Sequence, residues 1–159
     1  MSEILGSLFK YFMAFLAVVG VVGIAAKSMI TDKVGTAISD TTQAATDIRT
    51  TFANNPAGFA NLTTARAATG KLAPESMIAG SALTNPWNGA VTVQPELDGF
   101  SFSITHTNVP IDACPKLAAS QTQISAASIN GQAMNVPVDA GLAISQCAAD
   151  NTIVFRYKR

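Results

Sequence analysis

An apolar segment at the N-terminus constrains this chain more than any other feature of its sequence. It runs from Ile4 to Ala26, carries one charge, Lys10, and is free of charge from Tyr11 onward. As a helix, a segment of this length rises about 34 Å, which is enough to cross the hydrocarbon core of a bilayer. A cleavable secretory signal would place basic residues before a shorter apolar stretch, whereas this chain begins Met-Ser-Glu. We therefore expect a retained helix whose apolar surface is buried by lipid or by other chains.

Beyond Ala26 the apolar residues keep helical spacing, so the helix is predicted to continue with one apolar face. That face carries Ile30, Val34, Ile38, Ala45, Ile48 and Phe52, with Thr41 filling one position of the stripe. The opposite face carries Asp32, Asp40, Asp47 and Arg49. Asn54, Asn55 and Pro56 are expected to end the helix. We predict one helix of about fifty residues, far longer than an average globular helix, with a hydrophobic half over 1–26 and an amphipathic half over 27–53.

Residues 54–159 predict one globular head. Glycine, proline and threonine indicate a connecting loop over 56–82 that contains a short helix at 63–68. The run LTNPWNGAVTV (83–93) predicts a turn that leads into a strand. In GFSFSITHT (99–107) the alternation places Phe100, Phe102, Ile104 and His106 on one face, which predicts a half-buried antiparallel strand.

The C-terminal part of the head carries three further signals. Pro110 suits the first position of a helix through IDACPKLAASQ, in which Pro115 falls within the first turns or breaks the helix. Asn130-Gly131 between short apolar runs predicts a hairpin. The closing NTIVFRYKR predicts a strand with Ile153, Phe155 and Tyr157 on one face. The expected fold class is therefore α+β, with a long N-terminal helix packed on a small antiparallel sheet.

Composition argues against several classes of function. The formal net charge is zero and only 13% of the residues are charged, so no basic field is available to bind a nucleic-acid backbone. Two cysteines without a CxxC pattern, with a single histidine, argue against a zinc site. If the cysteines pair, the bridge would contribute roughly 3 to 4 kcal/mol in the chain-entropy model and favour an oxidising compartment. Two free thiols in a cytosolic protein are the alternative.

No constellation of residues predicts catalysis, and no cofactor is implied. His106 is the only histidine, and its place beside Ile104 favours the end of a core strand over a proton relay. The carboxylates are scattered without a paired spacing. Trp87 is expected to pack a turn against the head, with a binding aromatic as the alternative. Asn61-Leu62-Thr63 matches a glycosylation sequon that is common by chance.

The N-terminal segment itself contains candidates for assembly. Glu3 precedes the apolar run, and a carboxylate buried there is costly unless it is paired. The free ammonium of Met1 in a neighbouring subunit would be its partner, and a solvated Glu near a helix N-terminus is the alternative. Gly20 and Gly23, with nearby alanines, permit close helix packing and also local unwinding.

In its architecture the chain resembles a type IVb pilin. A retained N-terminal helix is followed by a loop, an antiparallel sheet and a C-terminal pair of cysteines. Within that group, LTNPWNGAVTV, VPIDACPKLA and CAADNTIVFRYK resemble the PilS-type subunits of conjugative and enteric thin pili. The resemblance covers most of the chain and is specific in the head.

The resemblance implies the type IV pilin fold, with Cys114 and Cys147 as its disulfide. It implies a major subunit that polymerises into a surface filament for conjugation or adhesion, after an inner-membrane stage and trimming by a prepilin peptidase. The assembly machinery and other pilin subunits are the implied partners. The helices would pack in the filament core through their apolar residues: Phe12, Phe15, Leu16, Val18, Val19, Gly20, Val22 and Gly23.

Two departures from the family pattern concern the N-terminus. Such pilins usually carry their acid at the fifth mature residue, where this chain has Leu5 and places the acid at Glu3. Many also have a helix proline where this chain has Gly20 and Gly23. Either Met1 is the mature first residue, which we favour, or cleavage after Gly6 removes Glu3.

Other classes of function are also compatible with this sequence. A minor pilin or a pseudopilin would differ in its abundance in surface filaments. A membrane-tethered binding module would never polymerise.

Overall fold

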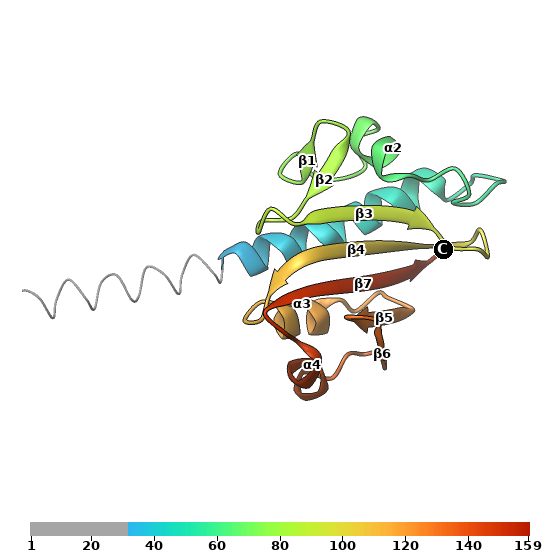
Figure 1. Cartoon of the computed structure of the whole chain (residues 1–159). Coiled ribbons are helices and arrows are strands. Elements are labelled where there is room, and N and C mark those ends of the chain that lie inside the picture. Colours follow the sequence, from blue (N-terminus) through green and yellow to red (C-terminus); the bar gives the residue numbers. More distant parts are fainter. Residues whose placement is uncertain (1–31) are drawn as a thin grey trace, which may run out of the picture. The chain divides into compact units, whose positions relative to one another are not determined.

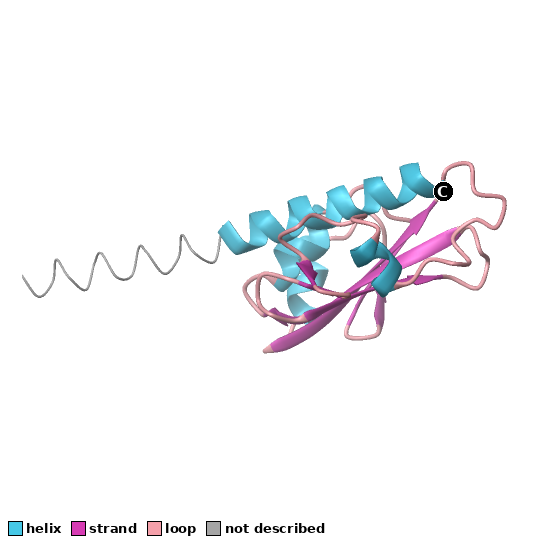
Figure 2. Ribbon diagram, turned by 90° about the horizontal axis from the view of Figure 1, so that it is seen from above, coloured by secondary structure: helices cyan, strands magenta, loops and turns pink. Residues whose placement is uncertain are grey.

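A helix over residues 32–52 opens the part of the chain, residues 32–159, that the computed structural model describes. This helix lies along one face of a sheet (Figures 1 and 2). Its buried residues recur at helical spacings and are Val34, Ala37, Asp40, Thr41, Ala44, Ala45 and Ile48. The amphipathic stripe is therefore confirmed in this stretch, as is the end of the helix just before Asn54. Val34 to Arg159 form one compact unit.

Asp40 departs from the polar face predicted for this helix. Its side chain is buried, and the Ser76 hydroxyl donates a 2.9 Å hydrogen bond to Oδ2 of the carboxylate. The sequence prediction was wrong here because it treated the helix alone. The loop that carries Ser76 and the buried Met77 packs over this flank of the helix.

Seven strands form one antiparallel sheet in the order β1-β2-β3-β4-β7-β5-β6. Their bounds are β1 Ile78–Ala79, β2 Ala82–Thr84, β3 Ala90–Pro95, β4 Ser101–Pro110, β5 Ala126–Ile129, β6 Gln132–Met134 and β7 Asp150–Lys158. The last strand, β7, lies between β4 and β5 (Figure 1). The predicted C-terminal strand is thus confirmed, and it joins the two halves of the sheet.

The centre of the core is the pairing of β4 with β7. Phe102 lies opposite Tyr157, Ile104 opposite Phe155 and His106 opposite Ile153, and all six side chains are buried. The alternation predicted for these two strands is confirmed at these positions.

The other face of β4 is less exposed than its alternation predicts. Ser101 and Ser103 are also buried, so the expected half-burial is wrong for this part of the strand. Ser103 lies between the longer Gln94 of β3 and Arg156 of β7 in the register. Small hydroxyl side chains are covered when long neighbours flank them on both sides.

Phe100 is also a correction, because it is 59% exposed instead of buried with Phe102. Strand β4 begins one residue later, at Ser101. The residues before it form a turn that closes through a 3.0 Å hydrogen bond from Gly99 N to Glu96 O. Phe100 therefore leaves the pleat that its alternation with Phe102 suggested.

The helix predicted from Pro110 begins later in the structure. Pro110 is the last residue of β4 and pairs with Asp150 of β7. Helix α3 spans Cys114–Ser120 with Pro115 in its first turn, where the missing N–H costs no helical hydrogen bond. The sheet pairing competes with the helix for Pro110, and this long-range pairing is not visible in the local sequence.

The remaining short elements match their local signals, apart from one helix that was not predicted. Helix α2 spans Thr64–Thr69 and is capped by Thr63. Asn130 and Gly131 both have positive φ, 51° and 83°, as a two-residue hairpin turn requires. Helix α4, Ala140–Gln146, has no counterpart in the sequence prediction.

Candidate functional site

The disulfide expected from the family resemblance joins Cys114, at the start of α3, to Cys147, which caps the end of α4. The Cα atoms of the two residues are 6.1 Å apart. The two helices pack against each other. The bridge therefore fixes α4 to the head at a point where the helix itself buries only Ala143.

Two asparagines hold the same end of α4 in place. Asn130 donates from Nδ2 to Gln146 O at 3.0 Å and to Asn151 Oδ1 at 2.9 Å. Asn151 is buried, and its Nδ2 donates to Val109 O and to Ala148 O. These bonds link α4 to the β5–β6 turn and to β7, so the position of α4 is fixed by polar contacts more than by a core.

Helix α4 exposes two large apolar side chains. Leu142 and Ile144 are 55% and 64% exposed. Beside the helix lies a hollow of about 160 Å³, lined by Gln132, Ala133, Met134, Asn135, Leu142 and Gln146. No ionisable side chain lines this hollow, which suits a partner group without charge.

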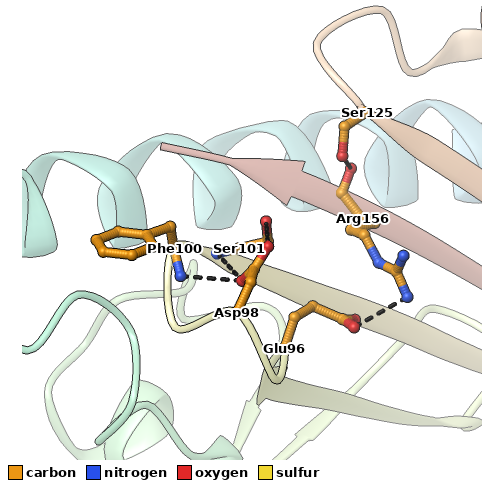
Figure 3. Close-up of polar contacts among 6 residues, drawn as sticks. All are labelled: Glu96, Asp98, Phe100, Ser101, Ser125 and Arg156. Carbon is orange, nitrogen blue, oxygen red and sulfur yellow. Dashed lines mark hydrogen bonds and ion pairs between the residues drawn. The ribbon is translucent and has the colours of Figure 1, made fainter.

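A second apolar feature is the β3–β4 turn, residues 96–100. Leu97 is fully exposed and Phe100 is more than half exposed. Asp98 holds the turn by accepting hydrogen bonds from Phe100 N, Ser101 N and Ser101 Oγ (Figure 3). These bonds, that from the Ser101 hydroxyl above all, lower the pKa of Asp98.

The base of the turn is tied to the rest of the sheet. Arg156 Nη2 of β7 lies 2.9 Å from Glu96 Oε2 (Figure 3). Phe59 N donates to Gly99 O at 2.8 Å. A Cβ atom on Gly58 would lie 2.1 Å from the same Gly99 oxygen. The loop after the N-terminal helix is therefore packed directly against the turn.

Arg49 joins the N-terminal helix to the C-terminal strand. Its guanidinium donates to Lys158 O at 3.0 Å, and to Gln123 Oε1 and O at 3.0 and 2.7 Å. It also lies 5.3 Å from the centre of the Tyr157 ring. The adjoining pocket of about 60 Å³ is too small for an organic ligand of ordinary size. These contacts are structural, because every nitrogen of the guanidinium already has a partner within the chain.

The candidates for chemistry are placed in the core. His106 is buried, with Nε2 3.0 Å from Thr41 Oγ1. Burial lowers the pKa of His106 to about 4, so the ring is neutral at pH 7 and has no access to a substrate. Trp87 is partly buried against the core, which fits the packing role expected for it. Within residues 32–159, no cluster of side chains could hold a metal ion.

The N-terminal assembly residues lie outside the described part of the chain. Met1, Glu3 and the helix-packing residues from Phe12 to Gly23 all precede residue 32. Over the described range, 32–159, no helix is both long and apolar enough to cross a membrane.

The sequence analysis missed the exposed apolar residues of α4 and of the β3–β4 turn. Asp98-Gly99 between two alternating runs is a hairpin signal that would have placed Leu97 at the tip of a turn. Asp139 accepts a 2.8 Å hydrogen bond from Leu142 N as the N-cap of α4, and an aspartate before Ala-Gly-Leu-Ala is a capping signal. Neither signal shows that the apolar residues face solvent.

The PilS family model, described as PilS N terminal, matches residues 31–158. No curated protein matches the chain.

Proposed function

This chain belongs to the PilS family of type IVb pilins, and from that premise we propose that it is the major structural subunit of a type IVb pilus. It polymerises through its N-terminal helix into a surface filament that serves conjugation or adhesion. The observation that carries the proposal is the position of the family match. It begins at residue 31, separated by four residues from an apolar segment, Ile4–Ala26, that contains a single charge.

Burial supports polymerisation. The helical stretch 32–52 buries its apolar stripe against its own sheet, so the head completes its core with that stretch. The upstream segment 4–26 has no polar face in its sequence, and apolar surface of this extent requires lipid or protein neighbours. In the filament it exchanges lipid for the same segments of other subunits. The proposal therefore divides the chain into a hydrophobic half of the helix (1–26), an amphipathic half of the helix (27–53) and a globular head (54–159). It also includes the type IV pilin fold.

Specific contacts within the filament core follow from the sequence. Glu3 pairs with the Met1 ammonium of a neighbouring subunit, because a buried carboxylate needs a cationic partner. Gly20 and Gly23 let helices approach closely. The larger apolar side chains, Phe12, Phe15, Leu16, Val18, Val19 and Val22, fill the space between helices.

The proposed assembly pathway is that of the type IVb pilins. The subunit resides in the inner membrane before assembly, a prepilin peptidase trims it, and the type IV pilus machinery polymerises it outside the cell. Its work is assembly, without a catalytic step.

A charge in the apolar segment tests the proposal. Val18→Asp or Val22→Asp is expected to abolish filaments in cells that contain the assembly machinery, because a carboxylate among packed helices is strongly unfavourable. The head should stay folded, which an intact disulfide and resistance to protease would report. Ala65→Asp, a charge on the exposed surface of α2, is the control and should leave filaments. Abundant normal filaments from the Val18 and Val22 variants would contradict the proposal.

A further inference from the structure

We propose that both Asn-Gly pairs of the head are sites of spontaneous deamidation, and that the fold keeps them intact with two separate sets of hydrogen bonds. The pairs are Asn88-Gly89 and Asn130-Gly131. Both asparagines are exposed to solvent, and both have a positive φ, 62° and 51°. The inference concerns the head alone, so it goes beyond the proposed function and is independent of filament formation.

Deamidation of an asparagine needs neither an enzyme nor a cofactor. The backbone nitrogen of the next residue attacks the side-chain carbon Cγ, the bond from Cγ to Nδ2 breaks, and ammonia leaves with the proton of the attacking nitrogen. Water then opens the cyclic imide at either carbonyl, which gives aspartate or isoaspartate and one new negative charge. Glycine favours the attack because it has no side chain to obstruct its nitrogen. A fold can slow the reaction by holding either the attacking nitrogen or the carboxamide.

At Asn88-Gly89 the structure holds the attacking nitrogen. Gly89 N donates a 2.8 Å hydrogen bond to Oδ1 of the buried Asn85. Asn85 is fixed in turn, because its Nδ2 donates to Thr107 O at 2.7 Å. A Cβ atom on Gly89 would clash with the same Thr107 oxygen, so the glycine is packed directly against β4. The Asn88 carboxamide itself has no hydrogen-bond partner within residues 32–159.

At Asn130-Gly131 the structure holds the carboxamide instead. Its Oδ1 accepts a 2.9 Å hydrogen bond from Thr152 N, while its Nδ2 donates to Gln146 O and to Asn151 Oδ1. These bonds direct the side chain toward β7 and the end of α4. Cyclisation turns the carboxamide toward its own backbone, so these bonds oppose it.

Both sets of hydrogen bonds are anchored at the same end of β4. Asn85 donates to Thr107 O, and Asn151 donates to Val109 O. These carbonyls lie at the register shift between His106 and Val109 in the pairing of β4 with β7. Such an irregularity leaves backbone groups outside the ladder, where side chains can bind them. The irregular end of β4 therefore supports both turns.

The two sites differ in what deamidation would do to the head. A carboxylate at position 130 would lose the donor to Gln146 O and Asn151 Oδ1 and would place a negative charge beside these two acceptors, which loosens the end of α4. A carboxylate at position 88 would break no hydrogen bond of the described chain. The site at which the product is harmful is thus the one whose carboxamide is held directly.

Deamidation of the detergent-solubilised full-length chain at mildly alkaline pH tests the inference. Trypsin cleaves after Lys71 and Lys116. This places Asn88 and Asn130 in different peptides, so mass spectrometry after a brief digestion measures both rates in one sample. In the unaltered chain each site should deamidate more slowly, by roughly tenfold or more, than in the same chain unfolded in guanidinium chloride, since one hydrogen bond is worth about that factor.

Two variants separate the two sets of hydrogen bonds. Asn85→Ala removes the acceptor of Gly89 N and should raise the rate at Asn88 by roughly tenfold, with the rate at Asn130 unchanged. Asn151→Ala removes one acceptor of the Asn130 carboxamide and should have the opposite selectivity. Each variant is the matched control of the other.

Hydrogen exchange in the unaltered chain covers the case in which a variant does not fold. The Gly89 amide should exchange more slowly than in the unfolded chain, by about a hundredfold or more, because its acceptor is buried. Equal rates of deamidation in the native and unfolded chain at either site would overturn the inference. So would folded variants that speed both sites equally, or a Gly89 amide without protection. None of these results would change whether the chain forms filaments.

Discussion

Nε2 of His106 lies 3.0 Å from Oγ1 of Thr41, and this contact joins the N-terminal helix to β4 at the centre of the sheet. The Thr41 hydroxyl donates its one hydrogen to Ala37 O. Nε2 must then be the donor to Oγ1, and in the neutral ring this leaves Nδ1 without a proton. Nδ1 is buried without a hydrogen-bond partner, so a second proton on the ring would find no acceptor there. Burial and this missing acceptor together favour the neutral imidazole.

Acid should weaken the head through His106. Its folded pKa is about 4, below the ordinary value of 6.5, so between these pH values the unfolded chain binds more protons. The free energy of unfolding should fall as the pH falls from 7, by about 2 kcal/mol at pH 5 and about 3 kcal/mol in all, with no further loss from this group below pH 4.

Urea denaturation of the detergent-solubilised chain, followed by the fluorescence of Trp87, would measure this pH dependence. His106→Gln is the control, since it cannot titrate. The nearest acidic residue on the facing helix, Asp40, is bonded to Ser76 and is the same in both proteins. An equal loss of stability in both between pH 7 and 5 would show that His106 is not the cause.

Removing the guanidinium group of Arg49 should loosen the N-terminal helix from β7. Arg49→Ala loses three hydrogen bonds and the stacking on Tyr157, and we expect unfolding to become easier by about 1 to 3 kcal/mol. Arg49→Lys keeps the charge but lacks the planar guanidinium with its several donors, and it should recover less than half of that loss. If lysine restores full stability, charge alone is what Arg49 supplies.

The turn that carries Leu97 should depend on Gly58. Gly58→Ala introduces a Cβ that meets Gly99 O, at a φ of +56°. Gly80→Ala is the matched control, because its φ is +68° with nothing within 4 Å of the new Cβ. The control should lose only about 1 kcal/mol from strain, and Gly58→Ala clearly more. Similar melting temperatures for the two variants would contradict the packing described for the turn.

Loss of the disulfide should release α4 before the rest of the head. The bridge closes a loop with a sequence separation of 33 residues, and Cys114→Ser with Cys147→Ser should lower the free energy of unfolding by roughly 3 to 4 kcal/mol. Because α4 buries only Ala143, hydrogen exchange should show its amides losing protection while those of β4 and β7 keep it. Retained protection in α4 would mean that the hydrogen bonds of Asn130 and Asn151 hold the helix in place without the disulfide.

Periodicity predicted those elements whose apolar residues face the core. The alternation around Ile153 in β7, the Asn130-Gly131 turn and the stripe of the N-terminal helix were each predicted from local sequence and confirmed. Helix α4 was missed because Leu142 and Ile144 face solvent, which leaves no apolar stripe to detect.

Other errors arose where tertiary contacts override a local pattern. Pro110 pairs with Asp150 across the sheet instead of opening a helix, and Asp40 is covered by the loop that bears Ser76. The exposure of Leu97 and Phe100 could not be predicted from sequence, since it depends on how the whole turn is anchored.

The measurement that tests the central claim most directly is electron microscopy of filaments sheared from expressing cells, with mass spectrometry of their protein through its N-terminus. We predict filaments composed mainly of this chain, in which the N-terminal peptide retains Glu3. A first residue of Ser7 would leave the filament in place and remove the Glu3 pairing. If the assembly machinery is present and the chain stays in the membrane fraction without filaments, it is not the major subunit, and the account is contradicted.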